Sequence, residues 1–226
     1  MSRPSSRDEI LDVFTALVAR NGYEQASLSA VAELAGISSK GTIVHHFGSK
    51  QRMLVLSHSS YIDRRIYEAE RLASEIDDPA DQLAALMYSL LRAHRDDRAA
   101  TVTFLREFTR FATDGSMVEL HRKRRSYREY VSRCVERGKQ TGLFEQVDTA
   151  LTTLQIFGMC NDVWTWYQPE KRVGPEEIAS SFVRNLLGGL VMESSKLADR
   201  FAPAWFAGLN ARMYDPIPLR HLPPRS

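Results

Sequence analysis

Residues 27–50 constrain the fold of this chain more than any other stretch, because they indicate two short helices joined by a sharp turn. Gly36 supplies the positive-φ position at which a helix ends, and Ile37 fills the corner. Ser38 or Ser39 can then cap the next helix by accepting backbone N–H bonds. A helix, a short glycine-bearing turn and a polar helix form the helix-turn-helix signature, so this stretch predicts a DNA-binding module.

The second helix of this pair is too polar to be packed on all sides. It offers short donors, one fixed cation and two imidazoles, which are groups that bind phosphates and base edges. A lysine at the start of the following helix would also meet phosphate at the positive end of the helix dipole. We therefore predict DNA contacts from Ser27, Ser38, Ser39, Lys40, Gly41, Thr42, His45, His46 and Lys50.

Segment 10–54 resembles the N-terminal domain of TetR-type bacterial transcriptional regulators. The segment departs from the family pattern twice. Gly36 to Phe47 holds one residue more than the pattern usually has, and Val44 stands where the family normally has a phosphate-contacting Tyr. The resemblance implies a homodimer that binds palindromic double-stranded operator DNA. It rests on Ile10, Phe14, Gly22, Tyr23, Ser27 to Ile37, Gly41-Thr42-Ile43, His45-His46-Phe47 and Ser49-Lys50.

Global composition adds little to this reading. The net charge of +2 over 226 residues is nearly neutral, so affinity for nucleic acid must come from local charge. Cys134 and Cys160 lack CxxC spacing and are expected to be buried packing thiols in a reducing compartment. The sequence shows neither a signal-peptide pattern nor an apolar run near the roughly 20 residues of a membrane span. We expect a cytoplasmic protein with no membrane partner.

Helical periodicity dominates the chain and strand-type alternation is absent, so we predict an all-α protein. The first helix should stop at Asn21-Gly22 and pack against Val31, Leu34 and Phe47. A long helix should run from Ser49 towards Ile76, and we place the domain boundary inside it. The predicted domains are a helix-turn-helix DNA-binding domain, 1–55, and a ligand-binding and dimerisation domain, 56–226.

The second domain is expected to contain further helices and a short helix near its end. Pairs of Asp, Gly and Pro residues separate these helices. A proline-rich tail should follow the short helix that holds Trp205 and Phe206. The expected spans are about 80–95, 97–113, 115–141, 148–167 and 176–197.

Two of these helices, within 151–167 and 178–192, are apolar around most of their circumference. Such a helix must be covered on more than one side, either within one core or by a second chain. Gly158, Gly188 and Gly189 each cost a helix about 1 kcal/mol against Ala, which close approach of another helix would offset. We favour a twofold interface between two copies, and the resemblance implies the same seam.

Large aromatic side chains and Met residues recur through the second domain. They fit either core packing or an apolar small-molecule site. The predicted effector-binding residues are Met87, Leu91, Phe104, Phe108, Phe111, Phe157, Trp164 and Tyr167, with Arg128.

Two patterns make the predicted effector more specific. Residues 164–169 and 175–178 resemble the C-terminal domains of TetR-type regulators of fatty-acid and sterol breakdown, several of which bind acyl-coenzyme A thioesters. Eight cations and two acids lie between Arg122 and Lys139, either as a solvated face or as a site for the phosphates of such a ligand.

Catalytic motifs are absent from the sequence, which has no GxGxxG, Walker loop, HExxH or GxSxG. The adjacent His45 and His46 would point about 100° apart on a helix, so we expect no metal site. No cofactor is predicted. We expect a transcriptional repressor that a hydrophobic small-molecule effector releases from its operator, with an acyl-coenzyme A as the candidate that the resemblance implies. A regulator sensing an aromatic or drug-like ligand remains an alternative, and a helical enzyme a remote one.

Overall fold

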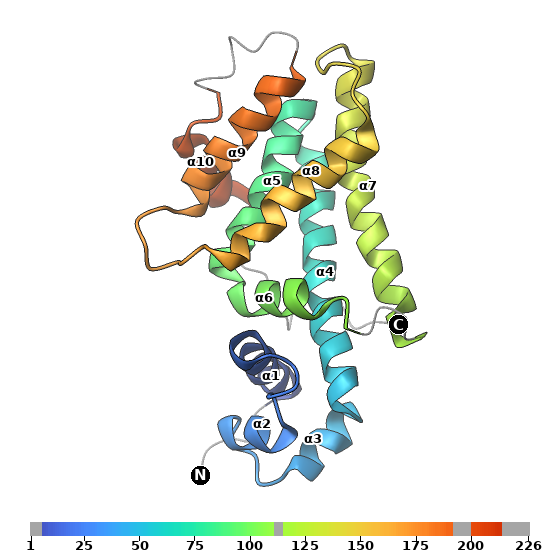
Figure 1. Ribbon diagram of the computed structural model, residues 1–226, viewed down its shortest axis with the longest axis vertical. Coiled ribbons are helices and arrows are strands. Elements are labelled where there is room, and N and C mark those ends of the chain that lie inside the picture. Colours follow the sequence, from blue (N-terminus) through green and yellow to red (C-terminus); the bar gives the residue numbers. More distant parts are fainter. Residues whose placement is uncertain (1–5, 111–114, 192–199, 214–226) are drawn as a thin grey trace. The chain divides into compact units, whose positions relative to one another are not determined.

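Figure 1 shows the computed structural model of the chain, which describes residues 6–110, 115–191 and 200–213. Apart from one isolated bridge, every regular element in these ranges is a helix, which confirms the predicted all-α fold. The elements are α1 (Arg7–Asn21), α2 (Leu28–Leu34), α3 (Lys40–Phe47), α4 (Lys50–Glu75), α5 (Pro79–Asp96), α6 (Arg98–Glu107), η1 (Gly115–Met117), α7 (Val118–Gln140), α8 (Thr149–Asp162), η2 (Val163–Thr165), α9 (Pro175–Leu190) and α10 (Pro203–Met213).

The chain divides into two compact units, each made of separate segments. Within the described part, the head unit holds residues 6–63, 98–110 and 115–122, and the body unit holds 64–97, 123–191 and 200–213. The head unit therefore contains α1, α2, α3, the first half of α4, α6, η1 and the start of α7. The domain boundary near residue 55 stays a prediction.

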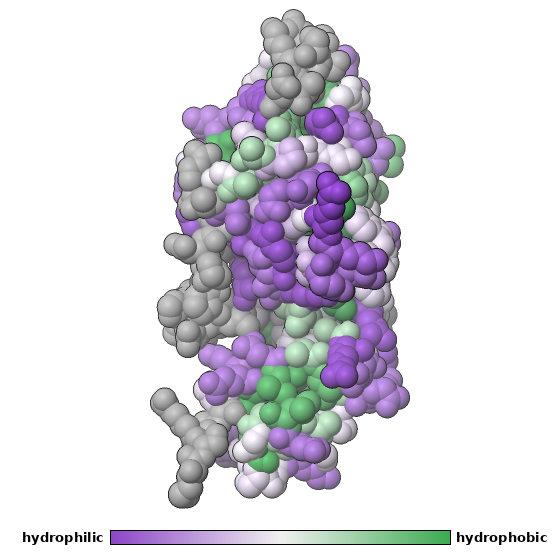
Figure 2. All heavy atoms as spheres, turned by 90° about the vertical axis from the view of Figure 1, so that its left-hand side faces the viewer, coloured by the Kyte–Doolittle hydropathy of each residue, from purple (hydrophilic) through white to green (hydrophobic). Residues whose placement is uncertain are grey.

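The head unit is built around α1, which lies between α2 and α6 (Figure 1). A capping box joins Ser6 and Glu9 at the start of α1 and satisfies two backbone N–H groups there. Figure 2 shows hydrophobic residues gathered in the lower part of one face, at the height of α1 and α2. The apolar core of this unit comprises Ile10, Phe14, Leu17, Val18, Tyr23, Ala26, Val31, Ala32, Ala35, Ile43, Phe47, Met53 and Leu54.

One residue that we expected in this core lies outside it. Leu34 is 64% exposed, whereas Val31 and Ala35 are buried. Residues four apart share one face of a helix, and Leu34 lies about 100° away from Ala35. The short α2 therefore has a narrower apolar face than its composition indicates.

The turn between α2 and α3 forms where the sequence predicts it. Gly36 has φ +65°, in the left-handed region that favours glycine. Ser39 occupies the N-cap position of α3, although its side chain makes no capping hydrogen bond. Ser49, at which the long helix was predicted to begin, caps α4, since its Oγ accepts a hydrogen bond from the backbone N–H of Arg52.

The body unit packs around α5, in which every residue from Pro79 to His94 except Asp81 is buried. Helices α8, α9 and α10 contact it, and Figure 1 shows them grouped around it. Asp78 caps α5 by accepting hydrogen bonds from the N–H groups of Ala80 and Asp81, both at 2.9 Å. The predicted short helix near the end of the chain is α10.

Three predicted helices end earlier in the structure. The span expected at 97–113 is α6, which stops at Glu107, and the span expected at 148–167 becomes a short 3₁₀ turn after Asp162. Helix α9 ends at Leu190 and not at 197, because Val191 is extended and forms a bridge with Phe144. Residues 192–199 and the expected tail at 214–226 lie outside the described residues.

A buried network of charges joins α4 to α5 within the body unit. Arg65 is only 1% exposed, and its Nη2 lies 2.9 Å from Glu68 Oε1. The same oxygen lies 3.1 Å from Arg92 Nη2, while Arg65 Nη1 donates to the carbonyl of Ser89. Two buried guanidinium groups therefore share the Glu68 carboxylate, and Arg92 Nη1 also lies 2.8 Å from Asp96 Oδ2. Loss of the shared carboxylate would leave buried charge poorly compensated.

Both cysteines are buried, as expected for packing thiols. Burial raises the pKa of Cys134 and Cys160 to about 12, so both stay protonated at neutral pH. Within the described ranges, no helix combines the length and the apolar composition that crossing a bilayer requires.

Candidate functional site

Helix α3 presents a polar outer face on an apolar anchor. Ile43 and Phe47, four residues apart, are buried in the head core. Lys40, His45 and His46 are exposed, as the predicted DNA-reading face requires. The buried side of α3 therefore fixes the helix in the head unit. Its hydrogen-bond donors and the ammonium of Lys40 remain accessible to a DNA duplex.

The other predicted DNA contacts flank this helix. Ser38, Ser39 and Gly41 are exposed and Thr42 is half-buried. Ser27 is the N-cap of α2, and its Oγ accepts a hydrogen bond from the backbone N–H of Ala30 at 3.1 Å. The hydroxyl proton of a capping serine remains available to a phosphate.

Lys50 differs from the other predicted contacts because the head unit already engages it. Its Nζ donates to the carbonyl of Glu24 at 3.1 Å and lies 4.3 Å from the centroid of the Tyr23 ring. Desolvation by burial lowers the pKa of Lys50, against the opposing effect of the Glu24 carboxylate. The phosphate contact of Lys50 stays a prediction, and this lysine also supports the turn between α1 and α2.

Two further cations near α3 were missed by sequence reasoning. Arg7 lies 5.1 Å from the centroid of the Phe47 ring, and Arg52 is exposed in the first turn of α4. Both are close in sequence or in space to the ends of α3. Both could have been predicted from the sequence, because they are basic residues that flank the helix-turn-helix.

The predicted effector residues fall in both units. Met87 and Leu91 are buried in α5, and Tyr167 is buried after η2. Phe157 and Trp164 are half-buried, and the Phe157 ring packs edge-on against Tyr127 at 5.8 Å. These five predicted residues belong to the body unit, whereas Phe111 lies outside the described residues.

Phe104 and Phe108 belong instead to the head unit. Their rings lie 5.0 Å apart, and the Phe104 ring is 4.7 Å from Tyr61 and 5.3 Å from His58. His58 is fully buried, and desolvation lowers its pKa to about 4, against the smaller opposing effect of Glu107. The imidazole is therefore neutral at physiological pH and packs as an apolar ring.

The basic run on α7 is only partly neutralised. Arg122 pairs with Glu119, and Lys139 pairs with Glu136. Arg128 is exposed, and no ion pair to it is found within the described residues. Positive charge therefore remains near Arg128 for an anionic group.

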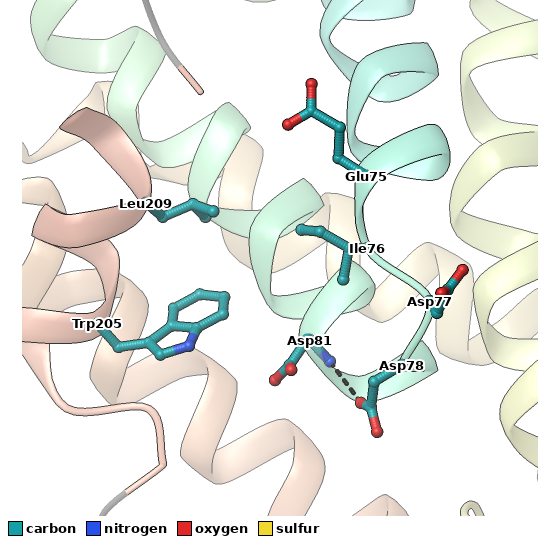
Figure 3. Close-up of a pocket in the computed structure, with 7 residues that line it drawn as sticks. All are labelled: Glu75, Ile76, Asp77, Asp78, Asp81, Trp205 and Leu209. Carbon is teal, nitrogen blue, oxygen red and sulfur yellow. Dashed lines mark hydrogen bonds between the residues drawn. The ribbon is translucent and has the colours of Figure 1, made fainter. Parts of the chain in front are cut away.

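A cavity of about 310 Å³ opens beside the junction of α4 and α5 in the body unit (Figure 3). Its lining is rich in carboxylates, which would repel the phosphates of a coenzyme A ester. None of the predicted effector residues lines it. The lining residues are Glu75, Ile76, Asp77, Asp78, Asp81, Trp205 and Leu209.

Metal-ligating side chains are not clustered in the part of the chain that the structure describes, where no three His, Cys, Asp or Glu residues are placed to hold an ion.

Two protein-family models match this chain, one in its N-terminal part and one in its C-terminal part. Residues 10–55 match the family described as bacterial regulatory proteins, tetR family. Residues 76–190, slightly more than half of the 226-residue chain, match the tetracyclin repressor-like C-terminal domain. The chain belongs to the TetR family. Membership of this family identifies the protein as a DNA-binding transcriptional regulator.

Two curated relatives are similar along most of their length. The HTH-type transcriptional repressor KstR2 of Mycobacterium tuberculosis strain H37Rv is 23% identical over 194 residues, which cover 84% of this TetR-family chain and 94% of the relative. The fatty acid metabolism regulator protein of Bacillus subtilis strain 168 is 26% identical over 194 residues, covering 80% and 94%.

Solved structures show the same fold. The ketosteroid transcriptional regulator KstR2 of Mycobacterium tuberculosis gives a TM-score of 0.77 at 22% identity and covers 84% of this chain and 98% of that one. AibR in complex with isovaleryl coenzyme A and operator DNA gives 0.73 at 22% identity, covering 80% and 97%. At these identities the likeness establishes the architecture of this TetR-family member.

Proposed function

We propose that this TetR-family regulator is a homodimeric repressor that binds a palindromic operator and is released from it by a hydrophobic effector of the acyl-coenzyme A class. The observation that carries the DNA-binding part is the exposure of Lys40, His45 and His46 on a helix anchored by Ile43 and Phe47. A regulator of this kind acts at the chromosome, so we place it in the cytoplasm.

The proposed DNA contact divides into positioning and reading. Lys40 and Lys50 supply fixed charge for phosphates, and Thr42, His45 and His46 supply groups that can reach base edges. Val44 is exposed beside them, where the family normally has a Tyr, and it offers methyl groups for apolar contact with a thymine methyl. Sequence discrimination should therefore come mainly from Thr42 and the imidazoles.

We expect Lys40→Ala to weaken binding to every duplex sequence, because it removes one phosphate contact. The salt dependence of binding, as the slope of log K against log salt, should fall by about one unit. Fluorescence anisotropy on a duplex selected by the wild-type protein from a random pool measures both quantities. Thr42→Ala should keep the slope and change the sequence preference.

Lys171→Ala is the matched control, because Lys171 is exposed on the loop between α8 and α9 of the body unit. It should leave affinity and slope unchanged. Equal slopes for wild type and Lys40→Ala would remove Lys40 from the interface.

The dimer is supported by glycines that have no packing reason within one chain. Gly158, Gly188 and Gly189 are exposed, and a Cβ at any of them would meet no described atom within 4 Å. Leu151 and Leu154 of α8 are 62% and 53% exposed. Exposed leucines and small residues on helix surfaces fit the close approach of a second copy, and a twofold dimer matches a palindromic operator.

The effector class is supported by two observations. AibR is named as a complex with isovaleryl coenzyme A and operator DNA, and the relatives include a fatty acid metabolism regulator. In this chain, apolar side chains of the body unit would take the acyl tail, and the surface around Arg128 would take the phosphates. Burying several CH₂ groups at about 0.8 kcal/mol each is sufficient for micromolar binding.

We expect Arg128→Glu to weaken binding of octanoyl-coenzyme A at least about tenfold and to leave binding of octanoate unchanged, since only the ester carries phosphates for Arg128 to contact. Isothermal titration calorimetry with both ligands measures the two affinities. Equal losses for ester and acid, or no loss for either, would contradict the coenzyme A assignment and favour an effector without phosphates, such as an aromatic or drug-like ligand.

A further inference from the structure

The cavity beside the junction of α4 and α5 has two unlike walls (Figure 3). Helix α10 contributes an indole and a leucine, and the end of α4 and the start of α5 contribute an isoleucine and four carboxylates. Its volume of about 310 Å³ lies at the lower end of the range of about 300–1,000 Å³ that small-molecule sites span. We call it the α10 cavity, and all of its lining residues belong to the body unit: Glu75, Ile76, Asp77, Asp78, Asp81, Trp205 and Leu209.

The apolar wall is held in place by aromatic packing. The ring centroids of Phe201 and Phe206 lie 5.3 and 4.9 Å from that of Trp205, and each ring makes an angle of 82° with the indole plane. Phe206 is fully buried and packs in turn against Tyr88 of α5 at 5.3 Å. Trp205 itself is half-buried, so its indole is fixed and still keeps accessible surface. Among aromatic side chains, the indole attracts cations most strongly.

The carboxylate wall is only partly neutralised by Arg200. Arg200 Nη2 lies 2.9 Å from Asp78 Oδ1, and Arg200 Nε donates to Asp81 Oδ1 at 3.0 Å. Desolvation raises the pKa of Asp78, but hydrogen bonds from the Asp81 N–H and from Arg200 outweigh that effect and leave the pKa below its usual value. One guanidinium therefore serves two carboxylates, and within the described residues neither Oδ2 has an ion pair.

Two further guanidinium groups contact the wall from outside the cavity. Arg71 lies 3.4 Å from Glu75, and the Glu75 side chain is 46% exposed. Arg137 Nη2 donates to the backbone carbonyl of Asp77 at 2.7 Å, which leaves the Asp77 carboxylate for other partners. The four lining carboxylates outnumber Arg71, Arg137 and Arg200 by one, so this wall keeps a net negative charge.

The two walls together select the chemistry of a ligand. The carboxylates repel an anion, and a neutral apolar molecule would remove them from water without giving a hydrogen bond in return. A cation on an apolar body pairs with a carboxylate oxygen and also covers the indole. The Asp81 carboxylate extends on the side of α5 where Trp205 lies (Figure 3), so one ligand can contact both.

We propose that the α10 cavity is a small-molecule site, separate from the predicted effector residues, that binds a primary amine carried on an apolar body. The ammonium group contacts Asp81 and Glu75, and the apolar body packs on Trp205 and Leu209. These last two residues lie beyond residue 190, where the match to the tetracyclin repressor-like C-terminal domain ends, so the apolar wall lies outside the matched domain. The proposal depends neither on DNA binding nor on an acyl-coenzyme A effector.

Two probes that differ only in their polar end test the proposal on the full-length protein. Phenylbutylamine is a cation at neutral pH, whereas phenylbutanol has the same apolar body and no charge. Isothermal titration calorimetry at low ionic strength should show that the amine binds at least about tenfold tighter than the alcohol. Added salt should weaken the binding of the amine, because it screens the carboxylates, and should not weaken that of the alcohol.

Three variants locate the binding site. Asp81→Asn should weaken the amine at least about fivefold and change the alcohol by less than about twofold, since only the amine pairs with the carboxylate. Glu75→Gln should act in the same direction, and it leaves the contacts of Arg200 intact. Trp205→Leu should weaken both probes, because each of them packs on the indole.

Glu170→Gln is the matched control for the carboxylate variants. Glu170 is exposed on the loop between α8 and α9 of the body unit, away from the residues that line the cavity. Its removal also deletes one negative charge and should leave both affinities unchanged. Circular dichroism confirms that each variant is folded.

Three results would overturn the proposal. The first is a wild-type protein that does not bind phenylbutylamine. The second is an amine affinity that stays the same in Asp81→Asn, Glu75→Gln and Trp205→Leu, which would place the amine elsewhere on the protein. The third is an equal loss for amine and alcohol in Asp81→Asn, which would mean that the carboxylate does not recognise the charge. Each result leaves the proposed regulator function unaffected, since no DNA or acyl-coenzyme A enters the experiment.

Discussion

Gly189→Arg should convert the protein to a monomer and abolish tight operator binding while the head unit stays folded. Gly189 is an exposed glycine near the end of α9, and a side chain there has open space within one chain. In the proposed dimer, the same position faces the partner at close range. An unpaired guanidinium buried in that seam should cost about 3–5 kcal/mol, which lowers the dimerisation constant by two to three orders of magnitude or more.

The loss of operator affinity should follow from the loss of the dimer. A palindromic operator is bound by two heads at once, and a monomer loses the contribution of the second head. Sedimentation velocity reports the oligomeric state, and anisotropy with the selected duplex reports the affinity.

Gly208→Arg is the matched control for this variant. Gly208 is also an exposed helical glycine, and a Cβ there would meet no described atom within 4 Å, but it lies in α10. The Gly208→Arg protein should remain dimeric and bind the duplex as the wild-type protein does. A Gly189→Arg protein that sediments as a dimer would place the seam elsewhere.

Glu68→Ala should destabilise the protein by about 3–5 kcal/mol, the range for removing one partner from a buried ion pair. Glu68 Oε1 is shared by Arg65 and Arg92, at 2.9 and 3.1 Å. Arg65 is 1% exposed, so water cannot replace the lost carboxylate at its guanidinium. Urea unfolding followed by circular dichroism at neutral pH measures the free energy of unfolding.

The control for Glu68→Ala lies on the same helix. Glu75 pairs with Arg71 at 3.4 Å, and their side chains are 46% and 32% exposed, against 8% and 1% for Glu68 and Arg65. Exposed pairs of this kind contribute at most about 0.5 kcal/mol. Similar losses for Glu68→Ala and Glu75→Ala would mean that solvent reaches the buried network.

The helix-turn-helix was predictable because its signals are local. Gly36 ends α2 through its own backbone conformation, and Ile43 and Phe47 anchor α3 through a four-residue spacing. The same holds for Asp78 and Pro79, which start α5 where the sequence places a break. Each of these features depends on residues within one or two turns of one another.

Helix ends and surface positions were harder to predict because they depend on distant partners. Leu34 has the composition of a core residue, but the core lies on the other side of α2. Helix α9 stops at Leu190, where Val191 pairs with Phe144 from a distant part of the chain. Lys50 matches a phosphate-binding position by its place at the start of α4, yet its ammonium also contacts the turn between α1 and α2.

The sequence by itself determined the all-α class, the short polar helix α3 that carries Lys40, His45 and His46, and the glycine turn before it, because helical periodicity and turn chemistry are short-range properties. Only the tertiary structure decided that α6 belongs to the head unit and that Glu107 holds the backbone of Tyr23, 84 residues earlier. A hydrogen bond between residues so far apart leaves no periodic trace in the chain. It arises only when α1 and α6 pack together and bring a carboxylate to a buried N–H group.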